Sequence, residues 1–113
     1  MKEYLYLFRG GNMSVMTEDE RKTQMKKWSD WIGAIAKDGK YVAGDPLGSE
    51  SRCISGQKKV ISDGPFAEAK ELVGGYLIVK AESLDEATTM AKDCPIYYVG
   101  GATEIRDIHN MEM

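Results

Sequence analysis

Residues 62–75 read SDGPFAEAKELVGG and connect two strand-like runs, Lys59–Ser62 and Gly75–Ala81. The stretch combines charged side chains, turn-forming residues and an aromatic ring more densely than any other part of the chain. Gly64-Pro65 and Gly74-Gly75 are turn signals near its two ends. Loops held by a rigid sheet often carry functional groups, so this stretch is the first candidate for a functional site.

Length and composition predict one ordinary globular domain over residues 1–113, with 42% hydrophobic and 29% charged residues. The formal net charge of −3 argues against direct nucleic-acid binding, which favours a basic face. Cys53, Cys94 and His109 fall short of the roughly four ligands of a structural zinc site. No apolar run reaches the roughly 20 residues of a membrane span, and the N-terminus does not resemble a signal peptide. We therefore expect a cytoplasmic protein without metal, cofactor or membrane contact.

Before the central stretch, the sequence predicts a strand, a helix and further strands. Residues 3–9 are apolar at nearly every position, which is typical of a strand covered on both faces. Thr17 and Glu20 form a capping box for a helix that Gly39 ends. Its expected core stripe is Met25, Trp28, Trp31, Ile32 and Ile35, although either tryptophan could line a pocket. A short strand at 41–43, a turn at 44–48 and a hairpin of 52–55 and 59–62 follow.

After the central stretch, residues 75–81 again predict a strand that is apolar on both faces. Ser83 and Glu86 form a second capping box, and Pro95 ends the helix that follows. Cys94 is then a small core residue rather than a reactive thiol. Residues 102–108 alternate as an exposed strand does. Glu104 and Arg106 share one face of that strand, where they predict an ion pair within the sheet or at an interface.

The order of these elements predicts an α+β fold. Without the hairpin it is a ferredoxin-like βαββαβ unit, in which two helices cover one face of an antiparallel sheet. The doubly apolar strands need a cover on the other face as well. We therefore expect a homodimer formed through the sheet face.

Residues 63–71 (DGPFAEAKE), followed by Gly74-Gly75-Tyr76, closely resemble the signature of the YCII-related, DGPF-type family. The similarity extends over most of the chain, with further matches at 44–47, 94–95 and 104–106. The resemblance implies a ferredoxin-like domain of the dimeric α/β-barrel type. It also implies possible association with a sigma factor of the extracytoplasmic-function type, beside which some family members are encoded. Enzymes with a histidine–aspartate pair are suspected among the relatives, but His109 lies outside the shared motif, which weakens the enzyme hypothesis for this chain.

The candidate ligand-binding residues lie in and around the central stretch: Asp45, Asp63, Phe66, Glu68, Lys70, Glu71 and Tyr76. Asp63 either fixes the turn or serves as a general base at a pocket, and it is the candidate catalytic residue. The favoured hypothesis is a small polar ligand bound in a pocket near this loop, with a regulatory module as one form of that hypothesis. The alternative is a cofactor-independent enzyme for proton transfer, elimination or isomerisation, with Asp63 as acid or base. A third hypothesis is a purely structural dimer.

Overall fold

A computed structural model describes residues 1–12, 14, 16–63 and 72–109 of the chain. Along these residues the elements are β1 (Lys2–Gly10), α1 (Glu18–Lys37), β2 (Tyr41–Pro46), β3 (Cys53–Ser55), β4 (Val60–Ser62), β5 (Val73–Ala81), α2 (Leu84–Ala91), the 3₁₀ helix η2 (Pro95–Val99) and β6 (Gly101–Asp107). The order agrees with the sequence prediction, except that η2 was not foreseen. Within the described ranges, no helix is both long and apolar enough to cross a membrane.

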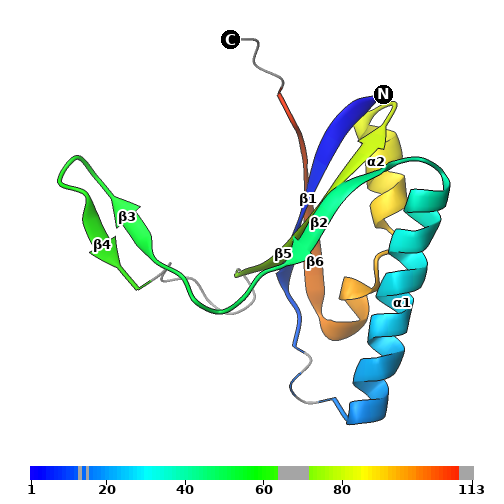
Figure 1. The fold of residues 1–113 in the computed structure, drawn as a ribbon, viewed down its shortest axis with the longest axis horizontal. Helices are drawn as coiled ribbons and strands as arrows, with labels where there is room; N and C mark the ends of the chain where they lie inside the picture. The colour runs from blue at the N-terminus through cyan, green and yellow to red at the C-terminus, as the bar shows by residue number, and fades with distance from the viewer. Residues whose placement is uncertain (13, 15, 64–71, 110–113) are drawn as a thin grey trace.

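The main sheet has four antiparallel strands in the order β2-β5-β1-β6. Figure 1 shows α1 and α2 on one side of this sheet and the β3–β4 hairpin on the other. The predicted α+β, ferredoxin-like fold with an extra hairpin is therefore confirmed. The dimeric arrangement stays a prediction.

The two central strands divide their side chains between the faces of the sheet. On β1, Tyr4, Tyr6 and Phe8 are buried toward the helices, whereas Leu5 and Leu7 are only half-buried on the open face. The same alternation on β5 buries Leu77, Val79 and Ala81 and leaves Tyr76 and Ile78 half-buried. The register pairs Leu5 with Ile78 and Leu7 with Tyr76, so the open face carries a continuous apolar centre.

Helix α1 begins as the sequence predicts. The Thr17 side chain accepts from the Glu20 amide, and the Glu20 carboxylate accepts from the Thr17 amide. Trp31 and Ile35 are buried, and Trp28 and Ile32 pack partly against the core. Met25 does not belong to the buried core as predicted, because its side chain is 65% exposed at the edge of the helix–sheet contact.

The turn predicted at 44–48 begins too early, because β2 continues through Gly44, Asp45 and Pro46. A proline fits here because β2 is an edge strand and lacks a partner on its outer side. Glycine fits at 44 because an added Cβ would come within 2.8 Å of the Tyr76 carbonyl oxygen. Pairing with β5 therefore decides the conformation of this segment over its local turn signals.

The second capping box forms only in part. The Ser83 hydroxyl accepts from the Glu86 amide at 3.1 Å, but the Glu86 carboxylate accepts from the Glu82 amide instead of Ser83. The same carboxylate forms an ion pair with the Lys40 ammonium at 2.9 Å, which links the end of α1 to α2. The hydrogen bond with Lys40 lowers the pKa of the Glu86 carboxyl and raises the pKa of Lys40.

Hydrogen bonds from buried or partly buried side chains join the sheet to α2 and join α1 to α2 and η2. The Tyr6 hydroxyl donates to the Ala87 carbonyl oxygen at 2.6 Å, and the Trp31 indole donates to the Met90 carbonyl oxygen at 3.1 Å. The buried Gln24 amide donates to the Pro95 carbonyl oxygen at 2.7 Å. Burial raises the pKa of the Tyr6 hydroxyl, which keeps it protonated as a donor.

We predict that Tyr6→Phe lowers the free energy of unfolding by about 1–2 kcal/mol, because the Ala87 carbonyl oxygen loses its buried donor while the ring remains in place. Urea denaturation followed by circular dichroism measures this change. Tyr41→Phe removes a hydroxyl from an exposed residue and serves as the control. Equal unfolding midpoints for the two variants would contradict a stabilising role for the Tyr6 hydrogen bond.

Candidate functional site

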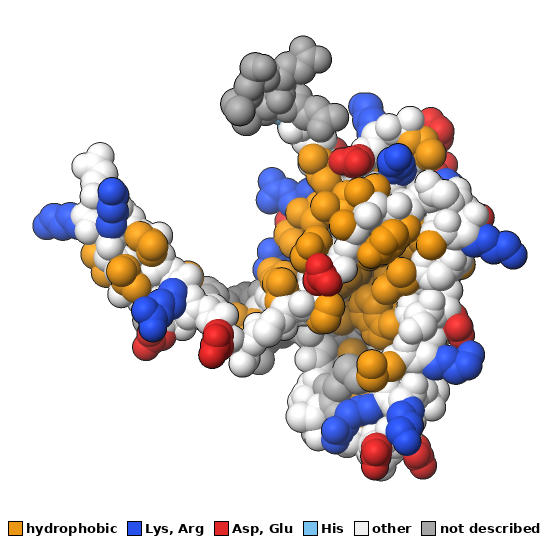
Figure 2. All heavy atoms as spheres, in the orientation of Figure 1, with side chains coloured by type: hydrophobic (Ala, Val, Ile, Leu, Met, Phe, Trp, Pro, Cys, Tyr) orange, Lys and Arg blue, Asp and Glu red, His pale blue; other side chains and the backbone are white. Residues whose placement is uncertain are grey.

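A cavity of about 420 Å³ lies between α1 and the end of the main sheet where β1 finishes. Its walls come from five separate segments: β1 and the residues after it, α1, the end of β2, the start of β5, and η2. Figure 2 shows hydrophobic side chains gathered on the surface between the strands and α1. The volume lies within the ordinary range of small-molecule sites, roughly 300–1,000 Å³.

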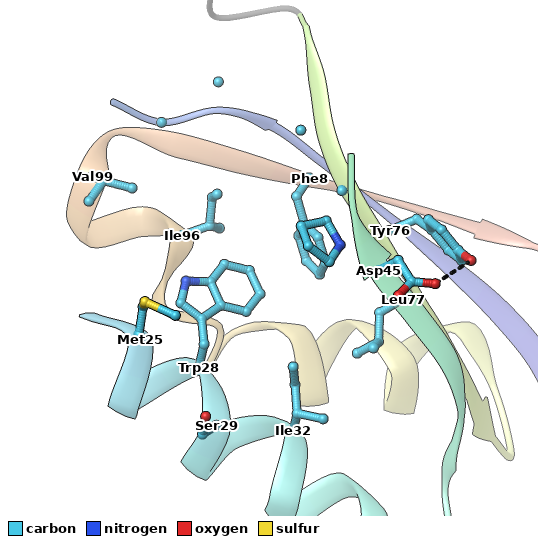
Figure 3. Close-up of a pocket in the computed structure, with 15 residues that line it drawn as sticks. Phe8, Met25, Trp28, Ser29, Ile32, Asp45, Tyr76, Leu77, Ile96 and Val99 are labelled. Carbon is cyan, nitrogen blue, oxygen red and sulfur yellow. Dashed lines mark hydrogen bonds between the residues drawn. The ribbon is translucent and has the colours of Figure 1, made fainter. Parts of the chain in front are cut away.

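Aromatic and aliphatic side chains make up most of the wall. Phe8 and Trp28 meet edge to face, with ring centroids 5.0 Å apart. Met25 and Ile32 add apolar surface from α1, and Ile96 adds it from η2, as Figure 3 shows. Trp31 lies behind this wall and meets both rings edge to face, with its ring centroid 5.7 Å from that of Trp28 and 6.1 Å from that of Phe8. The core therefore holds the Phe8 and Trp28 rings in place, and together they present a rigid apolar surface to the cavity.

Glycines line the remaining wall in two pairs, Gly10-Gly11 after β1 and Gly74-Gly75 at the start of β5. Gly11 has a φ of +81°, which favours glycine, and an added Cβ would lie 3.1 Å from a Val99 methyl group. At Gly75 an added Cβ would lie 3.2 Å from the Asp45 carbonyl oxygen. At Gly11 and Gly75 the structure thus has little room for a side chain, and backbone lines the cavity there.

Polar side chains are few and lie at the margin. The Tyr76 hydroxyl donates to the Asp45 carboxylate at 3.4 Å, and Figure 3 shows this pair at the edge of the cavity, on the far side of β2 from Trp28. Ser29 lines the cavity from α1. The arrangement suits a molecule with an apolar ring or chain and a polar group directed to the margin.

The site residues predicted from the sequence lie in different places relative to the cavity. Asp45 and Tyr76 are brought together beside the cavity. Asp63 is exposed directly after β4 and does not line the cavity. Phe66, Glu68, Lys70 and Glu71 lie outside the described residues.

Sequence reasoning missed several wall residues, among them Phe8, Gly11, Ile96 and Val99. Phe8 belongs to a strand whose pattern predicts only core. The glycines after β1 were interpreted only as a break of the strand, although glycine at a strand end also indicates close backbone approach. The indole of Trp28, foreseen as a possible pocket wall, does line the cavity.

The described residues include one buried thiol, Cys94, and no cluster of metal-ligating side chains. Burial raises the pKa of the Cys94 thiol to about 11, so it remains protonated near neutral pH. Within residues 1–63 and 72–109, apart from 13 and 15, no group of three His, Cys, Asp or Glu side chains lies close enough together to bind a metal ion. The cavity is lined mainly by apolar side chains and glycine backbone.

Comparisons with known proteins agree with this fold. The family model of the YCII-related domain matches residues 3–112. An uncharacterized protein from Rhizobium meliloti is 36% identical over 64 residues, which cover 48% of this chain. The chain spans about half the length of that relative, 52% by the same alignment.

A solved structure has a similar backbone. It is 5-chloro-2-hydroxyhydroquinone dehydrochlorinase from Burkholderia phenoliruptrix, in complex with 2,5-dihydroxybenzoquinone. The TM-score is 0.56 with 18% sequence identity, and the alignment covers 96% of this chain and 95% of the other. At this level of identity the similarity establishes a shared fold alone.

Proposed function

The chain belongs to the YCII-related family, and from the geometry of its cavity we propose that it binds a small organic molecule between α1 and the sheet. The observation that supports this proposal is a cavity of about 420 Å³ with a rigid aromatic wall and two glycine pairs. The second pair, Gly74-Gly75, follows in sequence the motif at 63–71 that the sequence analysis singled out.

The lining narrows the class of ligand. A strongly polar molecule would lose its hydration against Phe8, Trp28 and Ile32 without regaining hydrogen bonds. A planar ring with one or two polar substituents fits better, because the ring contacts the apolar wall and the substituents reach the backbone of the glycine pairs. The predicted small polar ligand is thus refined to a polar-substituted ring. Regulation together with a sigma factor stays a prediction.

We predict that Met25→Glu weakens ligand binding about tenfold or more, because it places a carboxylate on the apolar wall. Met25 is exposed on α1 and glutamate is a good helix former, so the fold should be retained. The probes are anilinonaphthalene sulfonate and 2,5-dihydroxybenzoquinone, the ligand of the structurally similar enzyme. Quenching of tryptophan fluorescence and a rise in melting temperature report binding.

The matched control is Ala34→Glu, which adds the same charge to an exposed position of α1 that does not line the cavity. It should bind both probes as the wild type does. The proposal fails if neither probe shifts the melting temperature of the wild type, or if Met25→Glu binds like the control.

The alternative function is a cofactor-independent enzyme. One contact favours it: the Tyr76 hydroxyl bonds to the carboxylate of Asp45, a residue that lines the cavity. Such a pair can take up and return a proton, which elimination and isomerisation both require. In this hypothesis Asp45 replaces the exposed Asp63 as the first candidate base.

We predict for this alternative that Asp45→Asn slows turnover about 100-fold while the melting temperature stays near that of the wild type. The assay measures chloride release from 5-chloro-2-hydroxyhydroquinone, the compound in the name of the similar enzyme. Asp63→Asn tests the original candidate in parallel. A wild-type protein that binds the compound but leaves it unchanged favours binding over catalysis.

We also propose that two copies of the chain pair through the open faces of their sheets. Leu5, Leu7 and Ile78 form the apolar centre of this face. A rim of charge lies along β1 and β6, where the Glu104 carboxylate bonds to Arg9 at 3.1 Å and lies 3.6 Å from Arg106. An apolar centre with a polar rim is typical of protein interfaces.

We predict that Leu7→Asp converts the dimer to a monomer, because paired sheets would bury the new carboxylate without a partner. Sedimentation equilibrium at micromolar concentrations measures the change. Leu84→Asp is the control, since Leu84 is an exposed leucine at the first turn of α2, where an acid is favourable. A wild-type protein that sediments as a monomer would refute the paired-sheet proposal.

A further inference from the structure

The β3–β4 hairpin stands apart from the main sheet. Its strands are three residues each, and they pair with each other in a separate two-stranded sheet. Gly56, with a φ of +73°, and Lys59, with a φ of 54°, shape the turn between them. Figure 1 shows the hairpin projecting from the body of the molecule. Two short strands alone are marginally stable in water, so such a hairpin needs a surface to pack against.

The hairpin carries apolar side chains where its own chain exposes them to water. Ile54 and Ile61 lie directly opposite each other in the register, so they share one face. They are 68% and 63% exposed, and neighbouring Val60 is 58% exposed. Figure 2 shows hydrophobic side chains on the hairpin flanked by basic ones. Three β-branched apolar residues on six strand positions are more than an ordinary solvated hairpin needs.

We propose that this hairpin is a dimerisation arm that packs Ile54 and Ile61 against a second copy of the chain. The proposal rests on the paired-sheet dimer proposed above and adds a second contact to it. It assigns the connection between β2 and β5 a role that the ligand cavity does not explain.

The position of the hairpin favours a second copy as its partner. The helices cover one side of the sheet, and the hairpin projects beyond the opposite, open side. A second sheet packed on that side would lie about 10 Å away. The chain extends 46 Å along each of its two long axes but only 19 Å along the third, and the hairpin accounts for much of this spread in Figure 1. An arm on this side therefore reaches along the flank of the partner rather than into empty solvent.

The size of the sheet face also favours an additional contact. Four strands of about eight residues cover roughly 500 Å² in flat projection, from strand spacing and rise per residue. A stable interface buries about 800 Å² of accessible surface on each partner, a measure that is larger than the projection of the same face. The four-stranded face alone would therefore make at most an interface of ordinary size. The exposed side chains of the hairpin would enlarge the apolar part of the interface.

The test compares dimer dissociation constants by sedimentation equilibrium for the wild type, the Ile54→Asp/Ile61→Asp double variant and the Leu84→Asp control. We expect the double variant to raise the dissociation constant at least about tenfold and the control to change it less than about twofold. Both substituted isoleucines are exposed, so circular dichroism should show an unchanged fold. Isotope-filtered NMR on a mixture of labelled and unlabelled protein should show contacts between the Ile54 and Ile61 methyl groups and the partner copy.

The outcomes separate the two proposals. A wild-type dimer whose dissociation constant is unaffected by the double variant, or whose arm methyl groups show no contact with the partner, overturns the arm proposal and leaves the paired sheets standing. A wild type that is monomeric throughout overturns both. A double variant that weakens the dimer while Leu7→Asp does not would place the interface on the arm and remove the sheet face from it.

Discussion

The pairing of β1 with β5 is the constraint on which the rest of the structure depends. These two strands lie at the centre of the sheet and are paired from Lys2 with Ala81 to Arg9 with Val73. Because side chains alternate along a strand, two strands that are apolar at most positions produce two apolar faces. One face is covered by α1, α2 and their aromatic contacts to Tyr6 and Phe8. The chain's own helices leave the other apolar face exposed, and the proposed pairing of two copies would cover it.

The cavity follows from the way this central pair ends. Phe8 is the last buried side chain of β1, and the register shifts between Phe8 and Arg9, where β5 begins. Near that point β1 reaches Gly10-Gly11 and β5 contains Gly74-Gly75, so this end of the sheet offers little side-chain volume to fill the space beside Trp28 and Ile32. The packed core and the cavity thus lie next to each other between α1 and the sheet. Close packing in the core keeps the aromatic wall of the cavity rigid.

The fold could be predicted from sequence wherever the signal was local and agreed with the tertiary structure. Thr17 and Glu20 mark the start of α1, and the nearly continuous apolar runs at 3–9 and 75–81 mark β1 and β5. Prediction failed where tertiary pairing overrides local preference: Gly44 and Pro46 indicate a turn, but hydrogen bonding to β5 extends the strand through them. Pro95 indicates the end of a helix, yet proline also suits the first turn of the 3₁₀ helix that follows. The cavity had no local signal, because five distant segments build it. Of its lining residues, sequence reasoning had considered only Asp45, Gly74-Gly75, Tyr76 and the Trp28 indole for a pocket.

The connection between β2 and β5 links the proposed roles. It leaves the sheet at Asp45-Pro46, beside the cavity, and returns at Gly74-Gly75, on the wall of the same cavity. The Leu47 amide donates to the Gly74 carbonyl oxygen at 2.9 Å, so the two ends of the connection are fastened together. The hairpin lies between these ends, as does the motif at 63–71 that identifies the family in sequence. In this fold the ferredoxin-like core forms the cavity and the open sheet face, and the insertion between β2 and β5 adds the hairpin.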